Sequence, residues 1–150
     1  MQQTIRNNLS YLYGFVLLVC MLPGQVSTAA SPEVQPALSG YDVVSYFTEH
    51  KAQRGSAKYA VTHAGSTYWF SSAEHQALFR KQPQRYLPQY DGYCAYGIRY
   101  GQMVEADPQA WSIVNDKLYL HTDHSFLEKW QADTEAAIRE GDEQWQVLRK

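Results

Sequence analysis

The sequence predicts a small α+β domain, and three observations support this class. The 150-residue chain is 45% hydrophobic and 19% charged, close to the average of globular proteins, which excludes disorder, collagen and coiled coil. Two segments alternate apolar and polar residues on either side of a two-residue turn, which is typical of β-hairpins. Between and after these segments, apolar residues recur at helical spacing. Short strands and helices in this order favour a single domain with one core.

The first thirty residues are predicted to be an export signal. One charge, Arg6, precedes an apolar run over residues 9–22, which is too short to cross a bilayer comfortably. A proline and a glycine break the run, and small residues then favour cleavage after Ala29 or Ala30. The mature chain is therefore expected in the periplasm or outside the cell, with no stable membrane insertion; a retained anchor is the alternative.

The mature chain divides into a flexible arm over residues 31–39 and a domain over residues 40–150 that ends in a helical extension. Loss of Arg6 with the leader leaves 12 basic against 15 acidic side chains, a formal charge of −3. Because no basic patch is present to neutralise phosphates, nucleic acid is excluded as a partner. Loss of Cys20 leaves Cys94 alone, so an internal disulfide is excluded as well.

Two hairpins are expected, each with a two-residue turn. The expected strands are Tyr59–His63, Ser66–Phe70, Trp111–Val114 and Lys117–His121. In the first hairpin such a turn pairs Val61 with Tyr68 and Tyr59 with Phe70. In the second, the apolar residues alternate onto one face and place His121 on the other.

Helices are predicted after each hairpin from capping-box spacing. Ser71 with Glu74, and Ser125 with Glu128, have the S-x-x-E pattern in which a hydroxyl and a carboxylate satisfy the first amides of a helix. Gly141 is expected to loosen or divide the last helical region, because glycine is a weak helix former.

The segment Tyr68–His75, with sequence YWFSSAEH, carries a resemblance to the YHS domain family. Phe79, Pro83 and Tyr86 follow at the family's spacing, and the match extends over about residues 37–145. Further matching segments are Gly40–Phe47, Gln89–Gly97 and Trp111–Leu120. The resemblance implies a strand-turn-strand-helix unit, YHS/TRASH-like and related to treble-clef-like metal modules, in a family suspected of binding heavy metals.

The chain departs from the family at the metal-binding cysteines. Members that carry thiolates place them at the positions of Ser45, Ser71 and His75. A serine hydroxyl is a poor ligand for zinc or copper, so of these three positions only His75 keeps a donor.

Cys94 is the most informative of the remaining donors, because it lies between Gly92 and Gly97 in a tyrosine-rich segment. The predicted metal ligands are His75, Cys94, His121 and His124, and the predicted ion is copper or zinc. His63, Met103 and Asp123 are further donors. This hypothesis requires the Cys94 thiol to lie beside the His75 imidazole.

The function favoured by these patterns is a non-catalytic binding module for a transition metal. Two alternatives stay open: a thiol-dependent enzyme or redox protein built on Cys94, and an interaction domain whose aromatic groove binds a protein partner. The groove residues are Tyr86, Tyr90, Tyr93, Tyr96 and Tyr100.

Overall fold

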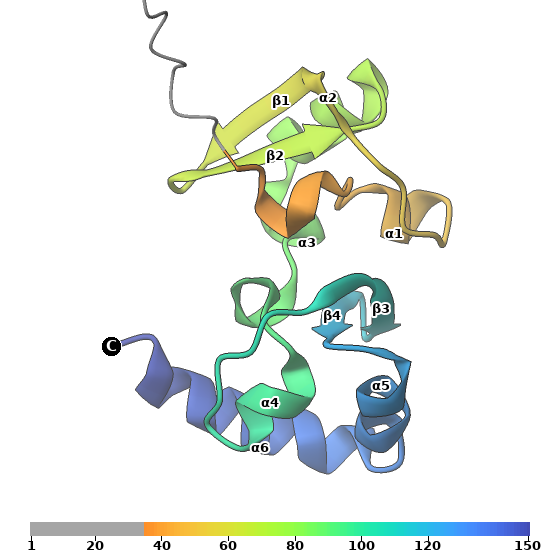
Figure 1. The fold of residues 1–150 in the computed structure, drawn as a ribbon. Helices are drawn as coiled ribbons and strands as arrows, with labels where there is room; N and C mark the ends of the chain where they lie inside the picture. Colours follow the sequence, from red (N-terminus) through yellow and green to blue (C-terminus); the bar gives the residue numbers. More distant parts are fainter. Residues whose placement is uncertain (1–34) are drawn as a thin grey trace, which may run out of the picture. The chain divides into compact units, whose positions relative to one another are not determined.

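The computed structural model describes residues 35–150 (Figure 1). The predicted export signal and residues 31–34 of the predicted arm lie outside these residues. The described chain is mixed α+β, as predicted. Its first half contains η1 (Ala37–Gly40), α1 (Ser45–Thr48), β1 (Ser56–His63), β2 (Ser66–Phe70), α2 (Ala73–Lys81) and α3 (Pro83–Tyr86). Its second half contains η2 (Gln89–Gly92), α4 (Ala95–Arg99), β3 (Asp107–Val114), β4 (Lys117–His121), α5 (His124–Gln131) and α6 (Thr134–Leu148).

Strands β1 and β2 form the first hairpin, and the Val61–Tyr68 pairing is confirmed. The predicted pairing of Tyr59 with Phe70 is wrong, because Phe70 pairs with Ser56. A bulge lies between Ser56 and the next paired residue of β1, so the strand carries extra residues there.

Strands β3 and β4 form the second hairpin in the predicted register. Ile113 pairs with Leu118 and Trp111 pairs with Leu120, which puts these apolar side chains on one face. His121 lies on the other face, where its ring packs against Trp130. One helix packs on each hairpin, α2 on β1–β2 and α5 on β3–β4 (Figure 1).

The predicted capping boxes are wrong in detail, although helices do begin at these places. The N-cap of α2 is Ser72, whose hydroxyl accepts from the His75 amide at 3.1 Å. The N-cap of α5 is Asp123, whose carboxylate accepts from two amides of the first turn. In both cases the capping residue directly precedes the helix, and neither predicted serine is used.

Two further expectations differ from the structure. The predicted arm reaches residue 39, but Ala37–Gly40 form the ordered turn η1, which packs on β2 and buries Gly40. Helix α6 continues through Gly141 instead of dividing there. This glycine provides space for the Tyr90 hydroxyl.

The core consists of three apolar clusters. The first half buries a cluster of Val43, Val44, Phe70, Phe79 and Tyr86. The second half buries Tyr90, Ala95, Ile98, Tyr119, Trp130 and Ala137. The third cluster joins Tyr46 of α1 to Leu118 and Leu120 of β4, and the Tyr46 hydroxyl donates to the Pro108 carbonyl at 2.8 Å. The two hairpin regions are therefore packed together through Tyr46.

Within residues 35–150, no helix combines the length and the apolar character needed to cross a membrane.

Candidate functional site

His75 lies in the first turn of α2 and is nearly fully buried. Its Nδ1 atom is 2.7 Å from Oδ2 of Asp42, a carboxylate with no exposed surface. Its Nε2 atom is 3.2 Å from Oε1 of Glu49 and 3.4 Å from the Thr48 hydroxyl. Both ring nitrogens of His75 therefore already face partners within the protein.

Ser71 shares the carboxylate of Asp42 with His75. Its hydroxyl donates to Asp42 Oδ2 at 2.7 Å, and its backbone amide donates to the same oxygen at 2.8 Å. In a serine hydrolase the nucleophile faces one imidazole nitrogen and the carboxylate faces the other. Here Ser71 and Asp42 both lie at Nδ1. The three residues thus form a buried structural network and not a catalytic triad.

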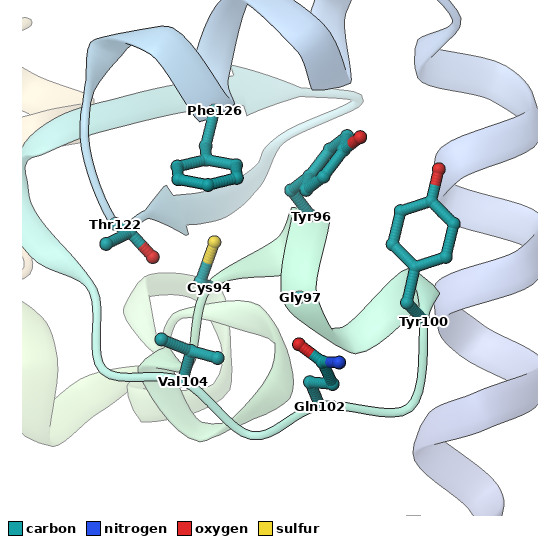
Figure 2. A pocket seen from close by; sticks show the side chains of 8 residues that line it. All are labelled: Cys94, Tyr96, Gly97, Tyr100, Gln102, Val104, Thr122 and Phe126. Carbon is teal, nitrogen blue, oxygen red and sulfur yellow. The ribbon is translucent and has the colours of Figure 1, made fainter.

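Cys94 occupies a different environment, between η2 and α4, with 1% of its surface exposed. Its backbone amide donates to the Val104 carbonyl at 2.9 Å. The backbone of Cys94 also forms an isolated parallel β-bridge with Leu120 of β4. Its side chain lines a cavity of about 350 Å³. The lining residues are Cys94, Tyr96, Gly97, Tyr100, Gln102, Val104, Thr122 and Phe126. The sulfur points toward the Phe126 ring, with Thr122 on one side and Tyr96 on the other (Figure 2).

The rim of this cavity is apolar and open to solvent. Among residues 35–150, the exposed large hydrophobic side chains are Tyr100, Met103, Val104 and Val147. Tyr100 and Val104, 58% and 39% exposed, line the cavity directly, and Met103 is next to Val104 in the same loop. Exposed apolar side chains that gather in one place are typical of binding surfaces.

The cavity lining carries no acidic or basic side chain. Arg99, in α4, directs its guanidinium to Glu140 of α6. A hydrogen bond with Tyr96 raises the pKa of Tyr100 further above its ordinary value of 10.0, and the phenol is neutral at pH 7 in either case. The polar groups that remain are hydroxyls, an amide and a thiol, which suit an uncharged ligand.

His121 is fully buried, and neither of its ring nitrogens has a hydrogen-bond partner. Its ring centroid is 5.0 Å from that of Trp130. Burial lowers the pKa of His121 from 6.5 to about 4, so the imidazole is neutral at pH 7. His124, the first residue of α5, is exposed to solvent.

The structure does not gather the four predicted metal ligands. The polar contacts of His75 are with Asp42, Thr48, Glu49 and Ser71, whereas Cys94 faces Tyr96, Val104, Thr122 and Phe126. In the part of the chain that the structure describes, no three His, Cys, Asp or Glu residues are grouped to hold a metal ion. A copper or zinc site stays a prediction, and Cys94 is the one proposed ligand that lines the cavity.

Sequence reasoning missed Asp42 as the partner of His75, and it missed Thr122 and Phe126 as neighbours of Cys94. Asp42 also binds the backbone near its own position, because its Oδ1 accepts from the Val44 amide at 2.9 Å. One signal in the sequence could have indicated the cavity. The apolar side chains of residues 100–104 lie in a segment with no strand or helix pattern, which is typical of an exposed binding loop.

Comparison with known proteins gave no matching family model, no matching curated protein and no matching solved structure. The resemblance to the YHS family therefore stays a prediction from the residues quoted above.

Proposed function

We propose that this protein is an exported binding module of YHS type that holds a small, uncharged and largely apolar ligand in the Cys94 cavity. The carrying observation is the arrangement of this cavity: a buried thiol at its wall and exposed apolar side chains at its rim. A volume of about 350 Å³ lies within the range of small-molecule sites.

Three properties of the cavity support an uncharged, aromatic ligand. The rings of Tyr96 and Phe126, with centroids 5.4 Å apart, provide flat apolar faces. The Gln102 amide provides hydrogen-bonding groups, and the Thr122 hydroxyl, which donates to the Glu105 carbonyl at 3.4 Å, can accept a hydrogen bond. A charged ligand finds no counter-charge in the lining, and a charge buried without a partner is strongly unfavourable.

A copper or zinc ion is the second candidate for the same cavity, because a thiolate is a ligand that both metals accept. This reading requires donors beyond Cys94. Thiol chemistry at Cys94 is the third candidate and requires an activating group; in the described chain, no basic side chain lines the cavity.

The test uses N-phenyl-1-naphthylamine, a neutral aromatic fluorophore, and 8-anilinonaphthalene-1-sulfonate, which adds a sulfonate to a similar framework. We expect one molecule of the neutral probe to bind per chain. The charged probe should bind with at least tenfold lower affinity. Val104→Trp, which fills the mouth, should weaken binding of the neutral probe at least tenfold, about 1.4 kcal/mol. The matched control is Val147→Trp, at a valine that is 64% exposed and does not line the cavity.

Equal loss of binding in both tryptophan variants would contradict the proposal. Titration with Cu(I) and Zn(II) tests the second candidate: a metal held by Cys94 is lost in Cys94→Ala and kept in Val104→Trp. Because both nitrogens of His75 are engaged, His75→Ala should leave that metal affinity unchanged.

A further inference from the structure

Two short segments of the chain share an unusual backbone shape. The φ angles of Leu38–Gly40 in η1 are 50°, 51° and 80°, and those of Tyr90–Gly92 in η2 are 57°, 52° and 85°. A proline precedes each turn and a tyrosine follows it. Consecutive non-glycine residues at positive φ are rare, because Cβ then crowds the backbone. The recurrence of such a turn is therefore a specific similarity.

The two hairpins also correspond to each other residue by residue. Every pair of the first register recurs 51 residues later in the second; for example, Val61–Tyr68 corresponds to Ser112–Tyr119. The bulge recurs as well, since it follows the pair of Ser56 in β1 and the pair of Asp107 in β3. Both hairpins have a two-residue turn between strands of eight and five residues.

The helices after the hairpins keep the same offset. Their N-caps, Ser72 and Asp123, stand 51 positions apart, and so do the fully buried aromatic residues Phe79 and Trp130. The similarity therefore covers the turn, the hairpin and the helix that packs on it.

We infer that residues 36–81 and residues 88–131 are two copies of one structural unit. Asp42 and Cys94 are equivalent, since each follows the tyrosine after its turn and donates its amide to a carbonyl of the next loop, of Gln53 at 2.8 Å and of Val104 at 2.9 Å. The hairpin offset makes Thr122 equivalent to Ser71 and Phe126 equivalent to His75. The Asp42 network and the Cys94 cavity are thus the same site in two copies.

This equivalence assigns Phe126 as the residue that keeps the Cys94 site open to a ligand, an assignment that rests on the proposed function. In the first copy the His75 imidazole faces Asp42 at 2.7 Å and occupies the site. In the second copy the phenyl ring of Phe126 has no atom that can donate to Cys94 or accept from it. The thiol and the Thr122 hydroxyl therefore face a cavity in place of a buried network.

The experiment rebuilds the network of the first copy in the second. In the full chain, Cys94→Asp alone should lower the midpoint of thermal unfolding, because it buries a carboxylate without a partner. The triple variant Cys94→Asp/Thr122→Ser/Phe126→His should recover about half of that loss or more. The control, Cys94→Asp/Thr122→Ser/Tyr96→His, brings the imidazole from a neighbouring lining position and should recover none of it. The reciprocal variant Asp42→Cys/Ser71→Thr/His75→Phe should bind two neutral probes per chain.

Recovery in the triple variant but not in the control supports the equivalence whether or not wild type binds the probe. Recovery without probe binding to the wild type therefore leaves the repeat intact and rejects the proposed function. A triple variant that is no more stable than the control, or that does not fold, overturns the inference. A reciprocal variant that folds and binds no second probe overturns the assignment of Phe126, the equivalent of His75, as the residue that keeps the site open.

Discussion

The hydroxyl of Tyr90 lies 2.8 Å from the position that a Cβ atom on Gly141 would occupy, and the Tyr90 Cζ lies 3.2 Å from it. The same hydroxyl donates to Asp142 Oδ1 at 3.0 Å. Gly141 thus lets the ring of the η2 turn approach the backbone of α6 closely. Such an approach explains a glycine in the middle of a fifteen-residue helix.

Gly141→Ala is expected to destabilise the protein, although alanine is the better helix former by about 1 kcal/mol. The new methyl group has to displace the Tyr90 ring, and crowding of this kind costs about 1–3 kcal/mol. Chemical denaturation should therefore show a net loss of stability. In the background of Tyr90→Phe, which removes the nearest atom, the same substitution should cost less. A stabilised Gly141→Ala variant would contradict the close approach.

Asp42→Ala is expected to be among the most destabilising single changes outside the apolar core. It leaves His75, the Ser71 amide and the Val44 amide without their buried acceptor, and we expect a loss of about 3 kcal/mol. Ser71→Ala removes one donor from a carboxylate that keeps its others, so we expect about 1 kcal/mol.

Urea denaturation of both variants measures these losses. The control is Glu143→Ala, an exposed position on α6 where a change within about 0.5 kcal/mol is expected. If Asp42→Ala and Glu143→Ala are equally stable, the hydrogen bonds of Asp42 to Ser71 and His75 do not stabilise the fold.

Local patterns were sufficient to predict the mixed α+β class and both hairpins, but not η1, the short helix α4 or the unbroken helix α6. The two-residue turns and the alternation in each strand fixed the second hairpin in its correct register, since side-chain direction has a period of two. The bulge in β1 was not predicted, because the extra residues follow from packing and leave no mark in the alternation. The caps failed for a similar reason: Ser71 has the right spacing but is bound by Asp42, 29 positions earlier.

The candidate site was predicted only in part. The glycines and tyrosines around Cys94 predicted that this residue takes part in a ligand site, and its side chain does line a cavity. The proposed neighbour, His75, is instead paired with Asp42. A sequence does not state which of two buried residues meets a histidine when the partners are tens of positions apart. The repeat was hidden as well, because its copies agree in turn geometry and strand register more than in residue type.

The stability of the protein should fall between pH 6.5 and about 4 through His121. Its pKa is about 4 in the folded chain, where burial disfavours the charged form, and has its ordinary value of 6.5 in the unfolded chain. Above pH 6.5 the imidazole is neutral in both states and contributes no pH dependence. As the pH falls below 6.5, the unfolded chain binds a proton that the folded chain does not, and unfolding is favoured. At about pH 4 and below, this lost stability reaches about 3 kcal/mol.

Comparison with His121→Leu isolates this effect from the titration of carboxylates. The free energy of unfolding, measured by urea denaturation from pH 7 to pH 4, should fall less steeply in the variant. At pH 7 the variant should be at least as stable as wild type, because it removes two buried nitrogens that have no partner. Parallel profiles for the two proteins would show that His121 is solvated in the folded state.

The Cys94 thiol should react with small neutral reagents in the folded protein and exclude large charged ones. Its surface is only 1% exposed, yet it lines a cavity whose mouth is bordered by Tyr100 and Val104. Methyl methanethiosulfonate is small enough to enter, whereas the dianion of 5,5′-dithiobis(2-nitrobenzoic acid) finds a narrow mouth and no counter-charge. We expect the second reagent to react at least tenfold more slowly, with peptide mapping used to distinguish Cys94 from Cys20. Val104→Ala should narrow this difference by widening the mouth, and Val147→Ala should leave it unchanged. If both reagents instead react at one common rate that rises with denaturant, modification proceeds through unfolding and the cavity does not admit ligands.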